Sequence, residues 1–311
     1  MYGLQYDCRC GQPGSEKRGR LMAEKITAYR FDQLDQTLSQ LNKENCAIIA
    51  GGTDVMVMYK SRRGVPPKIP KPIVFIDHLS ELKRVYQKHK DLYIGACSTY
   101  SELLENPLIP GPLKKAIKTI AAPAIRNRGT LGGNVCNASP AGDTLPLLYV
   151  YNAKLLLRSV NGERIVAISD FIQGVRRIQR ERNEIVAEII LPSVMEEGAH
   201  VVFEKVGNRN ADAIAKVGFA GYIRLNGAVI EDARFAFGAV GPTMVRSVDI
   251  EKGLFGKTIP LADTDIAQVV GAFDKIIKPI DDQRSTAIYR KTVALNLLRY
   301  FLSMNQYQHN Q

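Results

Sequence analysis

The chain has 311 residues, enough for two domains, and its 45% hydrophobic and 23% charged residues are typical of a folded globular protein. No segment approaches the roughly 18 consecutive apolar residues of a membrane-spanning helix, and the polar first twenty residues contain no readable secretory signal. The formal net charge of +11 is compatible with a nucleic acid, an anionic cofactor or an acidic protein as partner, but no nucleic-acid-binding motif is present. We therefore expect neither a nucleic-acid partner nor a membrane span.

Cysteine and histidine usage argues against disulfides and metal sites. The five cysteines are scattered and odd in number, which fits a reducing cytoplasm better than a disulfide framework. Cys8 and Cys10 lack a second pair of ligands, and the four histidines do not have metal-ligand spacing. We expect a cytoplasmic protein with no metal on this chain.

The N-terminal part of the chain begins without apolar periodicity. Residues 1–21 are expected to be a disordered tail or a non-native start, since Met22 precedes the first patterned segment. From Tyr29 onward, apolar residues at near-helical spacing predict a helix; they are Phe31, Leu34, Leu38 and Leu41.

Short apolar segments bounded by turn residues predict the next elements. The expected strands are residues 46–50, 73–77, 92–96 and 184–192. Ser98 or Thr99 is a candidate helix cap, and a helix is expected over residues 113–120. Residues 153–168 are expected to form a hairpin that turns at Asn161-Gly162.

After Pro192 a polar stretch is suited to a linker, and the rest of the chain has its own order of elements. A second tight turn is expected at Asn226-Gly227. The predicted strands are residues 201–205, 217–225 and 233–240, and the predicted helices are residues 263–277 and 285–302. Strands followed by helices predict α+β domains rather than one doubly wound sheet.

Two glycine-rich stretches follow apolar segments: IIAGGTDV, residues 48–55, and TLGGNVCNASPAGD, residues 130–143. Their backbone N–H groups bind phosphate oxygens well if they point into one concavity, and Thr53 and Thr130 add hydroxyl donors. The aspartates of both stretches are acceptors suited to ribose hydroxyls, or simply stabilise turns. Neither stretch matches the dinucleotide or P-loop fingerprint. We therefore hypothesise two separate loops that flank one diphosphate.

AGGTDV together with IRNRGTLGGNVCNASPAGD resembles the FAD-binding medium subunit of the molybdenum hydroxylases, the xanthine dehydrogenase and carbon monoxide dehydrogenase family. Residues 203–220 resemble the family's segment that joins the flavin domain to the C-terminal domain, and residues 281–298 resemble its last helix. The likeness covers residues 22–302, in order and with fitting spacings.

The resemblance implies an α+β fold in which a two-lobed FAD-binding domain of the vanillyl-alcohol oxidase/PCMH type precedes a smaller α+β C-terminal domain. We expect the FAD-binding domain over residues 22–195 and a C-terminal domain of the CO dehydrogenase flavoprotein type over residues 196–311, after the tail at 1–21.

The resemblance also implies which residues contact FAD. The first stretch would wrap the pyrophosphate and ribitol, and Thr130 to Asn134 would form the second loop. Asp143 would bind the flavin side or the ribityl chain, and Val186 would line the adenine end or the ring. Lys205 would stabilise negative charge on the reduced ring. Without the resemblance, Val186 is plain strand core and Lys205 an exposed strand residue. The cofactor-binding candidates are Ile48, Ile49, Ala50, Gly51, Gly52, Thr53, Asp54, Val55, Ile120, Thr130, Leu131, Gly132, Gly133, Asn134, Asp143, Val186 and Lys205.

Two departures from the family pattern affect this interpretation. Eukaryotic xanthine dehydrogenases carry an aromatic residue against the flavin ring where this chain has Ile120, which leaves ring stacking on that face open. The cysteines are too few and too scattered for the [4Fe–4S] cluster of some relatives, and we expect Cys136 to be a small packing residue.

No Ser/His/Asp or Cys/His constellation is apparent, so we expect no catalytic acid–base residue on this chain. The resemblance implies that FAD receives electrons from the [2Fe–2S] centres of a small partner subunit and passes them to NAD or another acceptor. Hydroxylation would take place on a molybdopterin-binding large subunit. Two alternatives are a self-contained FAD-dependent oxidoreductase of the same fold with its own substrate pocket, and a basic interaction protein without enzymatic activity.

Overall fold

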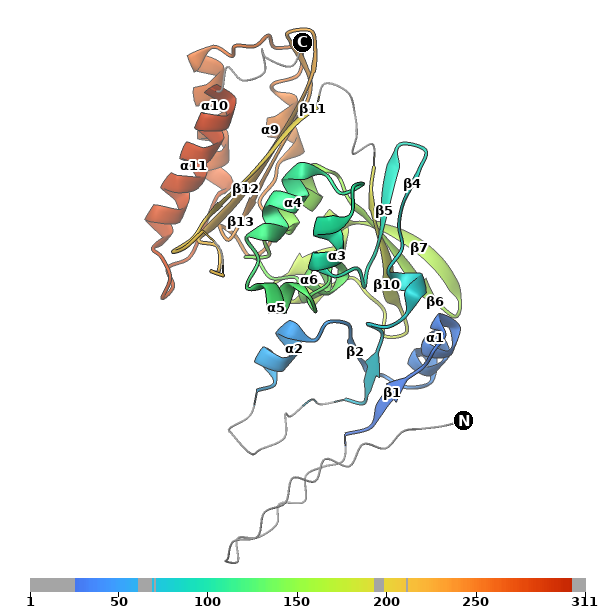
Figure 1. Ribbon diagram of the computed structural model, residues 1–311. Helices are drawn as coiled ribbons and strands as arrows, with labels where there is room; N and C mark the ends of the chain where they lie inside the picture. Colours follow the sequence, from blue (N-terminus) through green and yellow to red (C-terminus); the bar gives the residue numbers. More distant parts are fainter. Residues whose placement is uncertain (1–25, 61–68, 70, 193–198, 211, 304–311) are drawn as a thin grey trace, which may run out of the picture.

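Residues 26–60, 69, 71–192, 199–210 and 212–303 are described by the structure, a computed structural model, and they build three successive α+β units (Figure 1). The units are the first lobe (residues 28–82), the second lobe (residues 85–191) and the C-terminal domain (residues 199–303). The expected tail with Cys8, Cys10 and Met22, and most of the linker after Pro192, lie outside the described residues.

The first lobe is a parallel sheet in the order β1-β3-β2, with α1 packed against it. The predicted helix starts later than expected, because Tyr29 lies in a strand and pairs with Val74. The apolar spacing is correct from Leu34 onward, since Leu34, Leu38 and Leu41 are all buried. The elements are β1 (Ala28–Arg30), α1 (Leu34–Lys43), β2 (Ala47–Ile49), α2 (Thr53–Met58), β3 (Ile73–Phe75) and the short 3-10 helix η1 (Ser80–Leu82).

The second lobe is an antiparallel sheet in the order β4-β5-β10-β6-β7, with helices packed beside it. The predicted hairpin is present as β6 and β7, and Gly162 at its turn has a φ of 129°. The elements are β4 (Val85–Lys88), β5 (Asp91–Gly95), α3 (Tyr100–Glu105), α4 (Gly111–Lys118), α5 (Pro123–Arg126), α6 (Leu131–Asn137), α7 (Leu145–Val150), β6 (Lys154–Ser159), β7 (Gly162–Ala167), α8 (Ile168–Phe171), β8 (Ile172–Gly174), β9 (Arg177–Ile178) and β10 (Ile185–Leu191).

The C-terminal domain is a three-stranded antiparallel sheet, β11-β12-β13, whose one face is covered by α10 and α11 (Figure 1). Alternate residues of each strand face opposite sides of a sheet. Phe219, Phe235 and Phe237 pack in the core beside α10 and α11, whereas Phe203 and Ala220 belong to the core of the second lobe. The elements are β11 (Ala199–Val206), β12 (Val217–Asn226), β13 (Val229–Gly238), α9 (Val248–Lys252), α10 (Asp263–Ile276) and α11 (Ala287–Ser303).

This alternation determines where Lys205 points. Lys205 follows Phe203 by two residues in β11, so its side chain leaves the sheet on the same face, toward the second lobe. The alternative in which Lys205 is an exposed strand residue is wrong, since its side chain is 3% exposed. Within the described ranges, no helix combines the length and apolar character needed to cross a bilayer.

Thr99 is the helix cap that the sequence suggested. Its hydroxyl accepts a hydrogen bond from the Glu102 N–H at 3.2 Å, and the Glu102 carboxylate accepts one from the Thr99 N–H at 2.7 Å. This reciprocal capping box satisfies two N–H groups at the start of α3.

We expect Thr99→Ala to lower the free energy of unfolding by about 1 kcal/mol, because it removes the cap acceptor. Urea unfolding followed by circular dichroism measures the change. Thr264→Ala, on an exposed position in the first turn of α10, is the matched control and should change stability by less than about 0.5 kcal/mol. Equal effects of the two substitutions would contradict the assigned role of the cap.

Candidate functional site

A cleft of about 1350 Å³ lies where the three units meet. Its walls come from the turn after β2 and from α2 in the first lobe, from α5, α6 and β10 in the second lobe, and from the C-terminal domain. A cavity that opens between all three units is a common place for a ligand.

The two glycine-rich stretches are in direct contact at this cleft. At Gly51, the position that a Cβ would occupy is 1.8 Å from the carbonyl oxygen of Arg128, just before the second stretch. Asn137 also donates a hydrogen bond to the Asp54 carboxylate at 3.1 Å. Only a residue without a side chain allows the backbone of residue 51 to approach so closely.

Each stretch runs partly into a helix, so the expectation of two loops holds only in part. Gly52, with a φ of 72°, is the N-cap of α2, and the first stretch enters that helix at Thr53. Thr130 is the N-cap of α6 and accepts a hydrogen bond from the Gly133 N–H at 3.1 Å. The first N–H groups of a helix have no acceptor within the helix. In α6 they have acceptors elsewhere, since the N–H groups of Leu131 and Gly132 donate to the carbonyls of Ser98 and Ala96, and that of Gly133 donates to Thr130. Of the two helix starts, that of α2 is therefore the one that offers backbone donors to a ligand.

Gly132 has a packing role that the sequence did not reveal. A Cβ at this position would lie 2.5 Å from the Cβ of Ala96, and the Gly132 N–H donates to the Ala96 carbonyl at 2.9 Å. The glycine therefore lets α6 pack closely against the end of β5, in addition to lining the cleft.

A buried ion pair joins the C-terminal domain to the cleft. The Lys205 ammonium lies 2.7 Å from Oδ2 of Asp143 and donates to the Thr119 carbonyl at 3.0 Å. Burial raises the pKa of Asp143 to about 6, although the Lys205 charge acts to lower it. Oδ1 of Asp143 is buried and has no hydrogen-bond partner in the protein. One carboxylate oxygen is thus available to a ligand donor at the cleft wall.

Most of the predicted residues line the cleft: Ile48, Ala50, Gly51, Gly52, Thr53, Asp54, Val55, Ile120, Thr130, Gly132, Gly133, Asn134, Asp143 and Val186. Three do not form its wall. Ile49 is buried and follows Ile48 in β2, so it faces the opposite side of the sheet. Leu131 belongs to the core of the second lobe, and Lys205 reaches the cleft through Asp143.

The structure adds residues that sequence reasoning missed. Arg176 and Arg180 line the cleft, and neither was among the cofactor-binding candidates of the sequence analysis. The C-terminal domain contributes Arg290, which is 5% exposed, pairs with Asp282 at 2.7 Å and donates to the Ala239 carbonyl at 2.9 Å. No local sequence pattern predicts that these residues line the cleft, because their positions depend on contacts between distant segments.

The thiols at the cleft do not provide a reactive group. Burial raises the pKa of Cys97 to about 12 and that of Cys136 to about 11, so both remain protonated at neutral pH. Cys136 packs against the core of the second lobe, as expected. Across the described residues, no cluster of His, Cys, Asp and Glu could hold a metal ion.

These groups fit an elongated anionic dinucleotide such as FAD. The start of α2 and two arginines, Arg176 and Arg180, complement a diphosphate. The free oxygen of Asp143 can accept a hydroxyl or ring N–H, and Ile48, Ile120 and Val186 provide apolar wall for flat rings.

Comparison with known proteins gives the same cofactor. Residues 24–194 match the family described as the FAD-binding domain in molybdopterin dehydrogenase, and residues 203–304 match the CO dehydrogenase flavoprotein C-terminal domain. The glyceraldehyde dehydrogenase medium chain of Sulfolobus acidocaldarius is 32% identical over 86% of this chain and 94% of its own length. A putative xanthine dehydrogenase FAD-binding subunit of Escherichia coli is 32% identical over 66% of this chain and 70% of its own.

Solved structures agree with these sequence matches. A chain of the carbon monoxide dehydrogenase of Hydrogenophaga pseudoflava superposes with a TM-score of 0.80, at 25% identity, over 90% of this chain and 96% of the other. A chain of quinoline 2-oxidoreductase from Pseudomonas putida 86 shares the fold with a TM-score of 0.78, at 23% identity, over 91% of this chain and 97% of the other.

Substitution Gly51→Ala should weaken FAD binding about tenfold or more, because the new methyl group must displace the Arg128 carbonyl and separate the two stretches. Titration of the FAD-free chain with FAD, followed by flavin fluorescence, measures the affinity. Gly271→Ala is the control, since nothing lies within 4 Å of an added Cβ in α10. Wild-type affinity in both variants would argue against the contact at Gly51.

Substitution Lys205→Met should lower the free energy of unfolding by about 3 kcal/mol at pH 8 and by less at pH 5. The pKa of Asp143 is raised in the folded protein, so stability falls as the pH rises toward about 6 and this carboxyl ionises. Without Lys205 the pKa of Asp143 rises further, so the stability of the folded protein continues to fall at higher pH.

Urea unfolding between pH 5 and 8 tests this dependence on pH. The double variant Asp143→Asn/Lys205→Met has no carboxyl at this position and serves as the control. Its free energy of unfolding should not fall further below that of wild type as the pH rises from 5 to 8. An equal loss at pH 5 and pH 8 in the single variant would show that the two side chains are not coupled.

Proposed function

The chain belongs to the FAD-binding medium subunits of the molybdenum hydroxylases, the xanthine dehydrogenase and carbon monoxide dehydrogenase family, and we propose that it is the electron-transfer subunit of such a complex. It is an FAD-dependent oxidoreductase subunit that acts within a multi-subunit assembly. Bound FAD would supply the redox chemistry of this subunit. We propose that it links the [2Fe–2S] centres of a small partner subunit, as the source of electrons, to NAD or another acceptor. A molybdopterin-binding large subunit would carry out the hydroxylation.

The observation that supports this role best is the contact between the two glycine-rich stretches, beside a buried carboxylate with one free oxygen. These groups are fixed donors, acceptors and charges rather than a nucleophile with its base. Fixed charges and dipoles bind a redox cofactor and tune it without taking part in proton transfer.

We assign the diphosphate and ribitol of FAD to residues 48–55 and residues 130–134. The backbone donors at the start of α2 would bind the phosphate oxygens, and Arg176 and Arg180 would add positive charge to the same cleft. Because both stretches are held by the contact at Gly51, the donors are placed before the cofactor arrives.

We assign the flavin end to Asp143 and Lys205. The free Oδ1 of Asp143 would accept a hydrogen bond from the ribityl chain or the ring. Lys205 keeps that carboxyl ionised and adds a positive charge in a site of low exposure, where charge acts over a longer distance than in water. Its field would favour added negative charge at the cofactor.

Ile120 and Val186 would contact the flat rings of the cofactor. Both line the cleft, and Val186 lies in β10 where the pairing with β6 shifts by one residue. An isoleucine at position 120 packs against a ring but does not stack on it as an aromatic residue does.

These assignments give each of the two proposed domains a role in the site. We propose an FAD-binding domain over residues 22–195 and a C-terminal domain over residues 196–311 that adds Lys205 to the site. The described cysteines Cys46, Cys97 and Cys136 are free thiols, which supports a cytoplasmic location for the complex.

The proposed function is tested on the chain alone and in its complex. The chain purified alone should hold one FAD with a flavin absorption spectrum, and should react only with NADH or artificial dyes without turning over an organic substrate. A tagged chain recovered from its native host should bring along two further subunits, with molybdenum and iron detected by metal analysis.

Three outcomes would contradict the proposal. A colourless chain that cannot be loaded with FAD would favour a basic interaction protein. Turnover of an organic substrate by the isolated chain would favour a self-contained flavoenzyme. Recovery of the tagged chain without molybdenum or iron would argue against the proposed partner subunits.

A further inference from the structure

Helix α7 connects the cleft to the C-terminal domain. All six of its residues are buried, and Asp143 lies two residues before its first residue. At the N-cap position, the fully buried Thr144 donates a hydrogen bond to the Asn134 side chain at 2.7 Å. The cleft end of α7 is therefore fixed to the second glycine-rich stretch.

The C-terminal sheet holds the first turn of α7 through a pair of glycines. Gly218 and Gly238 are opposite each other in β12 and β13, and Cβ atoms on them would lie 3.5 Å and 3.3 Å from Cγ of Pro146. Lys205 is the partner of Gly218 in β11. One row of residues across the sheet thus contacts Pro146 through its two glycines and directs Lys205 toward Asp143. Asp143 precedes Pro146 by three residues.

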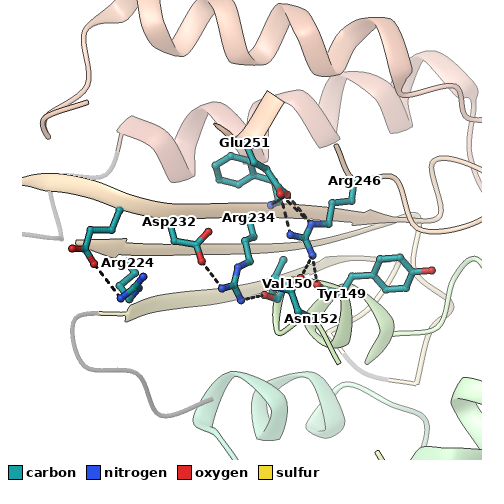
Figure 2. A network of polar contacts seen from close by, with 10 residues as sticks. Tyr149, Val150, Asn152, Arg224, Asp232, Arg234, Arg246 and Glu251 are labelled. Carbon is teal, nitrogen blue, oxygen red and sulfur yellow. Dashed lines mark hydrogen bonds and ion pairs between the residues drawn. The ribbon is translucent and has the colours of Figure 1, made fainter. Parts of the chain in front are cut away.

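Two arginines of the C-terminal domain hold the other end of α7 (Figure 2). Arg246 donates to the Tyr149 carbonyl and, at 2.6 Å, to the Asn152 side chain. Arg234 donates to the Val150 carbonyl at 2.9 Å. The carbonyls of the last helical turn are the negative end of the helix, so both cations are favourably placed. We call Arg234 and Arg246 the arginine clamp.

The orientation of the clamp is itself fixed. The Glu251 carboxylate, which is 2% exposed, lies 2.9 Å from Nε and 3.0 Å from Nη2 of Arg246, and it also accepts a hydrogen bond from the Phe235 N–H at 2.7 Å. Arg234 pairs with Asp232 and lies 4.3 Å over the ring of Tyr222. A planar guanidinium held at one edge presents its other edge in a set direction.

We infer that the arginine clamp is a positioning device for the Asp143–Lys205 pair, an inference that rests on the proposed function. The two members of the pair come from different units, so their separation depends on how α7 is seated on the C-terminal sheet. A buried ion pair is stabilising only when its geometry is close to ideal. A shift of α7 would weaken the influence of Lys205 on the Asp143 carboxyl, and the cofactor site would then respond differently to pH.

The test titrates the FAD-free wild type and the FAD-free Arg246→Lys variant with FAD between pH 5 and 8, and compares how the affinity depends on pH. Lysine preserves a cation for Glu251 but lacks the second edge that reaches α7. In wild type the affinity should change as Asp143 titrates. In Arg246→Lys the midpoint of that change should move to higher pH, and the dissociation constant should rise about threefold or more at pH 7.5.

A double-mutant cycle separates positioning from a general loss of structure. In the Lys205→Met background, Arg246→Lys should leave the pH midpoint where Lys205→Met alone puts it, because the interaction that it adjusts is already absent. If the midpoint moves equally in both backgrounds, or if a folded Arg246→Lys has the wild-type midpoint, the inference is overturned.

A second variant and a control complete the experiment. Arg234→Gln removes the other arm of the clamp and should move the midpoint in the same direction, and it replaces Arg246→Lys if that variant does not fold. Lys291→Gln breaks an ion pair of 3.0 Å with Asp274 on the helical face of the same domain and should keep the wild-type midpoint. A shift in this control would overturn the inference. Failure of the wild type to bind FAD would instead count against the proposed function.

Discussion

The site depends on the backbone contact between Gly51 and Arg128, which brings the two glycine-rich stretches together. The contact uses no side chain at residue 51, and any Cβ there would collide with a carbonyl group. Two helices therefore begin at one cleft although their sequences are about 80 residues apart. A diphosphate bound at the start of α2 would require little further ordering of the chain, because the fold has already positioned the donors there.

A second constraint is electrostatic and concerns the C-terminal domain. A carboxylate buried at a cleft wall is unfavourable unless a cation accompanies it. The FAD-binding lobes supply Asp143 but the C-terminal sheet supplies Lys205, so the site is complete only when the domains are docked. The glycine pair under Pro146 and the arginine clamp on α7 show how that docking is fixed at both ends of one short helix.

The site offers fixed charges and hydrogen-bonding groups that can bind a cofactor. Its thiols are kept protonated by burial, and its charged groups are paired or face the cleft. Such an arrangement suits a subunit that binds a redox cofactor while partner subunits carry the remaining centres. Ile120 lines the apolar wall of the cleft, and an isoleucine does not stack on a ring as an aromatic residue does.

The sequence by itself determined the α+β order of elements, the Thr99 cap and the family, because these depend on local periodicity, short motifs and their spacing along the chain. It did not distinguish loops from helix starts at residues 48–55 and 130–143, where glycine hides the helical pattern. Only the tertiary structure decided that Tyr29 pairs as a strand residue and that Lys205 faces Asp143. Those outcomes depend on contacts between segments far apart in the chain, and no local pattern encodes such contacts.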